Sequence, residues 1–101
     1  MTEIRTNTFD IRGVKFRNTS ADVAALKSGD LVNLTREPTN EFDPNAVACT
    51  SGGRFLGYMP KELARYLSPM MNEGLKLHAV IKQTEPVKML ITVVLVWDKE
   101  D

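Results

Sequence analysis

Hydrophobic and polar residues alternate along several short segments of this chain, which is the pattern of half-buried β-strands. Segment 8–16 alternates with one slip at Gly13, so we predict a strand there with a bulge near the glycine. Segment 21–26 is apolar without a high density of β-branched residues, and it favours a short helical turn. A second strand is predicted over 31–37, because Pro38 removes a ladder donor and restricts the residue before it.

The second half of the chain alternates more clearly than the first. The run 46–49, a turn at 51–53 that contains two glycines, and the run 55–59 together predict a β-hairpin. Segment 75–81 alternates again, a proline-containing turn follows, and 89–97 is rich in β-branched residues. We expect the last two runs to form a terminal pair of strands.

Apolar residues recur at helical spacing from 61 to 73, which predicts the main helix of the chain. Pro60 stands where the start of a helix tolerates proline, and Gly74 favours a helix end. Pro69 lies inside the pattern and is expected to kink or divide the helix.

Five or six short strands with one main helix predict a mainly β fold. The class we expect is a small antiparallel barrel, closed or nearly closed, of which the OB-like barrel is one version. A chain of 101 residues has room for one modest hydrophobic core, so residues 1–101 are expected to form a single domain. Its core spans about 8–97, between a short polar N-terminus and an acidic C-terminal tail.

The formal net charge is zero, so the composition provides no general electrostatic argument for binding a polyanion. A local basic face is still compatible with the sequence, because Arg12, Lys15 and Arg17 crowd one early segment. Cys49 is the single cysteine and His78 the single histidine, which excludes an internal disulfide and a multi-cysteine zinc site. We therefore expect no metal and no cofactor.

The most apolar stretch, 89–97, has about half of the ~20 residues that a membrane-spanning helix needs. Residues 1–10 lack the apolar run of a secretory signal. We expect a cytoplasmic protein that does not act at a membrane.

Two motifs in the middle of the chain resemble the central motifs of the HIRAN family. They are REPTNEFDPNAV at 36–47 and LGYMPKELA at 56–64, and the resemblance extends to GVKF at 13–16. It implies a modified OB-like barrel, a fold that this family uses both fused to fork-remodelling helicases and nucleases and as a stand-alone bacterial or phage domain. In the fork remodellers the domain recognises the free 3′ end of single-stranded DNA.

The resemblance also implies roles for individual residues. Phe16 and Phe42 match the aromatic pair that sandwiches the terminal base, and stacking tolerates any base because every base has a π-face. Asp43 matches the acidic residue that accepts a hydrogen bond from the terminal 3′-hydroxyl, and its negative charge would repel a terminal phosphate. The positions matching contacts to the phosphates or the terminal nucleotide are Lys15, Tyr58 and Lys61, and Asn40, also nominated for nucleic-acid binding, matches a polar residue of the same loop as Phe42 and Asp43.

The sequence departs from the family pattern at some of these positions. Lys15 replaces an arginine and loses bidentate phosphate geometry, whereas Phe16 and Phe42 keep the stacking of tyrosine and give up its hydroxyl. Tyr58 replaces a histidine.

Four of the nominated residues also have a structural interpretation. Phe16 and Phe42 suit the core of a small barrel, and Asp43 suits a turn in which its side chain bonds to the nearby backbone. Lys61 suits a solvated helix surface.

Three classes of function follow from these patterns. The first is a non-enzymatic module that captures a single-stranded DNA end in DNA repair or replication-fork processing, with a separately encoded helicase or nuclease as partner. The second is a protein–protein adaptor on the same barrel, which a zero net charge also suits. The least favoured is a metal-dependent hydrolase, in which Glu37, Glu41 and Asp43 hold Mg²⁺.

Overall fold

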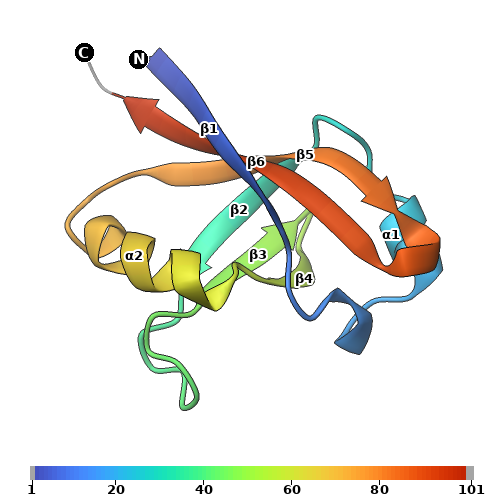
Figure 1. The fold of residues 1–101 in the computed structure, drawn as a ribbon, viewed down its shortest axis with the longest axis horizontal. Coiled ribbons are helices and arrows are strands. Elements are labelled where there is room, and N and C mark those ends of the chain that lie inside the picture. Colours follow the sequence, from blue (N-terminus) through green and yellow to red (C-terminus); the bar gives the residue numbers. More distant parts are fainter. Residues whose placement is uncertain (1, 100–101) are drawn as a thin grey trace.

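The computed structural model of the protein describes residues 2–99, which form a six-stranded antiparallel sheet (Figure 1). Along the sheet the strands follow the order β1-β6-β5-β2-β3-β4. The strands are β1 (Thr2–Asp10), β2 (Leu31–Arg36), β3 (Val47–Ser51), β4 (Arg54–Tyr58), β5 (Leu77–Glu85) and β6 (Leu90–Lys99). The helices are α1 (Ser20–Ala24), α2 (Lys61–Asn72) and the short 3₁₀ helices η1 (Val14–Phe16) and η2 (Pro86–Lys88).

The sheet is curled, and its two edges meet at one point. Arg12, just after β1, forms an antiparallel bridge with Tyr58 at the end of β4. The Arg12 amide donates to the Tyr58 carbonyl at 2.7 Å, and the Tyr58 amide donates to the Arg12 carbonyl at 2.9 Å. The fold is therefore a mainly β half-barrel of the OB-like class, as the strand pattern predicted.

Gly57 makes this close approach of the two edges possible. Its φ is 150°, and a Cβ atom there would overlap the Arg12 carbonyl oxygen and press on the Ile11 side chain. Any other residue would push the Arg12 segment away from β4. A glycine in the LGYMPKELA motif thus serves the closure of the barrel.

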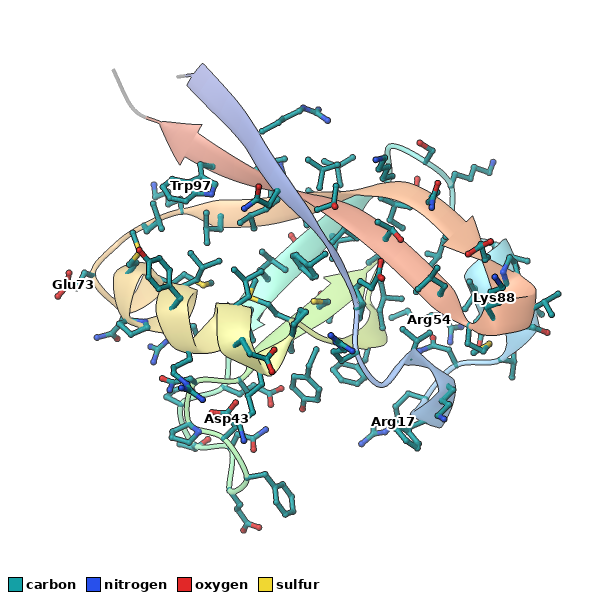
Figure 2. All side chains as sticks on the ribbon, in the orientation of Figure 1. Arg17, Asp43, Arg54, Glu73, Lys88 and Trp97 are labelled. Atoms are coloured by element: carbon teal, nitrogen blue, oxygen red, sulfur yellow. The ribbon has the colours of Figure 1, made fainter. Side chains whose placement is uncertain are left out.

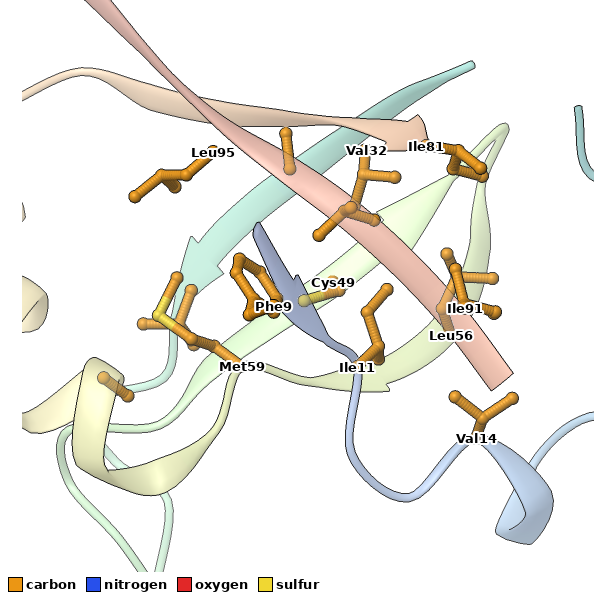
Figure 3. Close-up of a cluster of buried hydrophobic side chains, with 14 of the residues drawn as sticks. Phe9, Ile11, Val14, Val32, Cys49, Leu56, Met59, Ile81, Ile91 and Leu95 are labelled. Carbon is orange, nitrogen blue, oxygen red and sulfur yellow. The ribbon is translucent and has the colours of Figure 1, made fainter. Parts of the chain in front are cut away.

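The core lies inside the curl of the sheet (Figure 3). Its larger side chains include Phe9, Ile11, Val32, Leu56, Ile81 and Ile91, and α2 contributes Ala64 and Leu67 from its inner face. Cys49 is fully buried among them, and burial raises the pKa of its thiol to about 12. This cysteine is a core residue, as its strand position indicated.

The main helix confirms its prediction to within one residue. It runs without interruption from Lys61 to Asn72, so Pro69 does not divide it. The helix ends in a Schellman motif: the Leu75 amide donates to the Met70 carbonyl at 3.0 Å, and the Gly74 amide to the Met71 carbonyl at 3.1 Å. Gly74 has the positive φ, 108°, that this motif requires.

The predicted strand over 8–16 is wrong beyond Asp10. Gly13 adopts a left-handed conformation with φ 78°, which turns the chain into η1. This turn buries Val14 and leaves Phe16 exposed, whereas continued alternation would have placed both in a strand. The bulge of β1 lies between Arg5 and Thr8 instead, where the register against β6 shifts.

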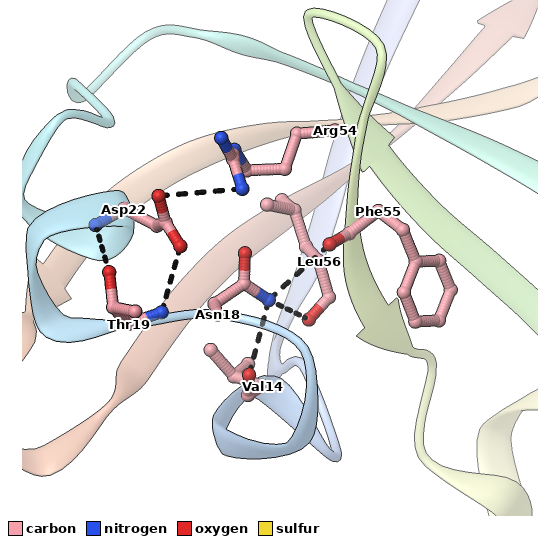
Figure 4. A network of polar contacts seen from close by, with 7 residues as sticks. All are labelled: Val14, Asn18, Thr19, Asp22, Arg54, Phe55 and Leu56. Atoms are coloured by element: carbon pink, nitrogen blue, oxygen red, sulfur yellow. Dashed lines mark hydrogen bonds and ion pairs between the residues drawn. The ribbon is translucent and has the colours of Figure 1, made fainter.

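A buried amide explains why the chain leaves the sheet here. The Asn18 side chain donates to the carbonyl oxygens of Val14 (3.1 Å), Phe55 (3.3 Å) and Leu56 (3.2 Å), so it binds η1 to β4 (Figure 4). The bonds to Phe55 and Leu56 join residues far apart in the sequence, so no local pattern could predict them.

The other predicted elements are confirmed. The short helix at 21–26 is α1, which begins with a capping box between Thr19 and Asp22. The hairpin is β3 and β4, and the terminal pair is β5 and β6. Of the predicted acidic tail, Glu100 and Asp101 lie outside the described residues. Within 2–99, no helix has the length and apolar character needed to cross a bilayer.

Candidate functional site

An open cavity of about 510 Å³ lies between the loop that follows β2, the end of β4 and the start of α2. It is lined by Arg12, Asn40, Phe42, Asp43, Ala46, Tyr58, Met59 and Lys61. The structure therefore brings together five of the nominated residues from three separate parts of the chain. We call this space the end cavity.

The start of the loop is held in place because hydrogen bonds connect the end of β2 to α2. The Arg36 guanidinium donates from Nε to Ser68 Oγ at 2.8 Å and from Nη1 to Asn72 Oδ1 at 2.9 Å. Ser68 is fully buried, so this contact is shielded from water. The first arginine of the REPTNEFDPNAV motif is thus a positioning residue for the loop.

Asn40 and Asp43 hold the loop through their own side chains. Asn40 Oδ1 accepts from the backbone amides of Phe42 (2.9 Å) and Asp43 (3.1 Å), and Asp43 Oδ1 accepts from the Asn45 amide at 2.9 Å. These are Asx-type turns, so Asp43 has the turn-forming role considered above. Asp43 also lines the end cavity, so the same residue forms the turn and borders the cavity.

Glu37 joins the loop to β4. Its Oε1 accepts from Tyr58 Oη at 2.9 Å and from Asn40 Nδ2 at 3.0 Å. The hydrogen bond to Glu37 raises the pKa of Tyr58, and desolvation and the charge of Glu37 act in the same direction. Glu37 therefore orients two residues of the end cavity.

The two nominated phenylalanines lie at the surface. Phe42 is 91% exposed and Phe16 is 77% exposed, so neither ring belongs to the core. Phe16 and Lys15 do not line the end cavity: they line a neighbouring one of about 240 Å³, and Lys15 Nζ lies 5.5 Å from the Phe16 ring centroid. Arg12 lines both cavities, so they adjoin.

Arg12 is the site residue that the sequence analysis did not nominate. The only signal for it was the basic run that it shares with Lys15 and Arg17. Its position depends on the bridge to Tyr58, which is a long-range contact.

The charges around the end cavity are mixed. Arg12 and Lys61 supply cations that suit phosphate oxygens, and Asp43 supplies an anion that only accepts hydrogen bonds when ionised. Such a site combines groups that attract anions with a group that repels them.

Two of the three carboxylates considered for a metal site accept hydrogen bonds from other groups of the protein. Glu37 Oε1 accepts from Tyr58 and Asn40, and Asp43 Oδ1 accepts from the Asn45 amide. Across residues 2–99, no three His, Cys, Asp or Glu side chains gather in a group that could hold a metal ion.

Sequence comparison connects the chain to a larger nuclease. A Fanconi-associated nuclease 1 homolog from Arabidopsis thaliana is 39% identical over 54 residues, which are 52% of this chain and 6% of that protein. This chain thus spans only a small part of the relative's length.

Solved structures share the fold. A protein from Lactobacillus plantarum superposes with a TM-score of 0.85 at 21% identity, covering 95% of each chain. The crystal structure of the HIRAN domain of human HLTF gives 0.73 at 19% identity, covering 94% of this chain and 78% of that one. The NMR structure of the HLTF HIRAN domain in its DNA-bound conformation gives 0.64 at 20%, covering 97% and 80%. At these identities the likeness establishes the fold alone.

A family model decides the classification. The model of the HIRAN domain matches residues 4–98, which is nearly the whole chain and includes the loop, β4 and α2 around the end cavity. This chain belongs to the HIRAN domain family.

Proposed function

We propose that this domain is a non-enzymatic module that captures the 3′ end of single-stranded DNA in the end cavity. The observation that carries the proposal is an almost fully exposed aromatic ring, Phe42, beside the carboxylate of Asp43 and the cations of Arg12 and Lys61. An exposed ring on an ordered loop offers a face for stacking without a conformational change.

The contributions of these groups differ in kind. Stacking of a base on Phe42 supplies about 1–3 kcal/mol without selecting a base. Arg12 and Lys61 bind the phosphates, which supplies affinity that falls as salt rises. Phe16 stacks from the neighbouring cavity, next to the Lys15 ammonium.

Selectivity for the end comes from Asp43. The turn with Asn45 uses Oδ1, and a carboxylate oxygen has more than one acceptor position, so a terminal 3′-hydroxyl can donate to the same group. A terminal phosphate brings like charge to the carboxylate and is repelled.

The comparisons support this proposal. One structure with the same fold is of a HIRAN domain in its DNA-bound conformation, and one sequence relative is a Fanconi-associated nuclease homolog. We place the module in DNA repair or replication-fork processing, where a fused or separately encoded helicase or nuclease acts on the captured strand.

Fluorescence anisotropy with a labelled single strand tests the proposal. The strand carries a free 3′-hydroxyl and is compared at low salt with its 3′-phosphate twin and with a duplex. We expect tightest binding to the 3′-hydroxyl strand, and a loss of about tenfold or more in Phe42→Ala because one stacking contact is removed.

Tyr66→Ala is the matched control, because Tyr66 is another exposed ring, 73% accessible, that lines neither cavity described above. It should bind as the unmodified chain does. If no DNA binds at high micromolar protein, the end-capture function is wrong and the adaptor becomes the better account.

A further inference from the structure

A further cleft lies beside the start of β4, whereas the end cavity lies beside the end of that strand. It is open, measures about 450 Å³, and shares none of its lining residues with the end cavity. The residues that line it are Arg17, Gly52, Gly53, Arg54 and Phe55. We call it the arginine cleft.

Aromatic rings connect the two spaces. Phe55 lines the arginine cleft and Tyr58 lines the end cavity, and their ring centroids are 5.2 Å apart in an edge-to-face arrangement of 71°. The Arg17 guanidinium lies 5.5 Å from the Phe55 ring centroid. A DNA strand that extends from the end cavity in this direction would pass the rings of Tyr58 and Phe55 and then reach the Arg17 guanidinium. In Figure 2, Asp43 and Arg17 lie toward the same lower side of the molecule.

The backbone that carries Arg17 is held rigidly. Its neighbour Asn18 is buried and donates to the carbonyl oxygens of Phe55 and Leu56 on β4, as Figure 4 shows. These hydrogen bonds keep the Arg17 segment alongside β4, the strand that carries Phe55 and Arg54. Both arginines are thereby placed by one set of buried hydrogen bonds.

The floor of the cleft is a glycine turn. Gly52 and Gly53 have φ values of 56° and 81°, which a two-residue hairpin turn between β3 and β4 requires. Apart from the adjacent residues of the chain, no atom lies within 4 Å of where a Cβ would stand at either position. The turn therefore leaves room for a phosphodiester backbone beside the two arginines.

The charges of the cleft favour an anion. Arg54 is paired with Asp22 at 3.4 Å, and the Arg54 side chain is half exposed, so this ion pair is weak and screened by solvent. Among residues 2–99, Arg17 makes no ion pair. Two arginines therefore line the cleft, and in the described chain their one ion-pair partner is the half-buried carboxylate of Asp22, which already caps α1.

We propose that the arginine cleft binds a backbone phosphate of the same DNA strand, on the 5′ side of the nucleotide held in the end cavity. This inference rests on the proposed function and extends it from a terminal nucleotide to a longer segment of strand. Arginine suits the task because its planar fork donates two parallel hydrogen bonds to phosphate oxygens.

The test measures how affinity depends on strand length and on salt. Labelled oligothymidylates of about two and about eight nucleotides, each with a free 3′-hydroxyl, are bound to the unmodified chain and to the double variant R17Q/R54Q. We expect the long strand to bind at least tenfold more tightly than the short one in the unmodified chain. The double variant should lose this advantage and bind the short strand unchanged.

Salt dependence provides an independent readout. Each phosphate contact to a single strand contributes about 0.7 to the slope of log K against log salt, so the slope for the long strand should fall by about 0.7–1.4 in the double variant. Arg65→Gln removes an exposed arginine of α2 outside both cavities and the cleft, so it is the control for net charge for R17Q, which also removes one positive charge. R17Q alone leaves the Arg54 ion pair intact and guards against effects on folding.

The outcomes separate the two proposals. If the unmodified chain binds neither strand, both proposals are overturned. If it binds both and R17Q/R54Q keeps the length advantage and the slope, or if Arg65→Gln lowers them as much as R17Q does, the arginine cleft is not a phosphate site and end capture stands.

Discussion

Two surface segments of this domain each expose a phenylalanine, but different kinds of side chain hold the two segments in place. The loop 37–45 carries Phe42, and the segment 13–18 carries Phe16. In the loop, Asn40 and Asp43 bond to the loop's own backbone and also line the end cavity. Asn40 and Asp43 thus both hold the loop and line the cavity.

The segment 13–18 divides these tasks among different residues. Gly13, Val14 and Asn18 hold it, through a left-handed turn, a core contact and a buried amide. The exposed side chains of Phe16 and Arg17 make none of those contacts. Removing the side chain of Asn40 or Asp43 should therefore change both binding and stability, whereas in the segment the two properties depend on different side chains.

The largest expected effect is the loss of stability when the Asn18 side chain, which holds segment 13–18 against β4, is removed. Asn18→Ala removes the side-chain donor to the carbonyl oxygens of Phe55 and Leu56, whereas the Val14 carbonyl keeps the backbone amides of Arg17 and Asn18 as donors. Because unpaired buried acceptors cost about 1–3 kcal/mol each, we expect a loss of about 2–3 kcal/mol in the free energy of unfolding. Urea denaturation measures it. Arg17→Ala, one residue away and exposed, should change stability by less than about 0.5 kcal/mol. Equal losses in the two variants would contradict the division of tasks.

A smaller effect is expected in the loop, where one side chain has two roles. Asp43→Ala removes the acceptor for the Asn45 amide and should cost about 1 kcal/mol of stability, whereas Asp43→Asn keeps an acceptor and should cost almost none. Both variants should lose the preference for a 3′-hydroxyl over a 3′-phosphate, because both remove the negative charge.

Thermal unfolding and anisotropy on the two strands check this pair of variants. A preference that survives in Asp43→Asn would mean that charge at Asp43 does not select the end. Stability that is unchanged in Asp43→Ala would mean that the loop does not depend on its Asx turn.

The smallest effect on stability is expected at Phe16. Because this ring is largely exposed, Phe16→Ala should alter the free energy of unfolding by less than about 0.5 kcal/mol. It should weaken single-strand binding by about 1–3 kcal/mol, the contribution of one stacked base. Paired denaturation and binding titrations measure both quantities. A loss of stability comparable to that of Asn18→Ala would place Phe16 among the residues that hold the segment.

Elements whose cause is local could be predicted from the chain. The helix at 61–73 follows from apolar spacing and a glycine stop, and the hairpin follows from two short strands around two glycines. The loop motif, with Asn40 and Asp43 at turn positions, could be recognised because its hydrogen bonds span only two or three residues.

Other features depended on contacts between distant residues and could not be read from periodicity. The alternating pattern predicted that Phe16 continues a strand. Instead, Asn18 donates hydrogen bonds to the carbonyl oxygens of Phe55 and Leu56, 37 and 38 residues away, and these bonds hold the segment that forms η1. Arg12 reaches the end cavity only because Gly57 allows β4 to approach it. Alternation reports which side of a strand faces apolar surroundings; only packing of the closed barrel decides which strands meet, and therefore which cations stand beside the aromatic rings.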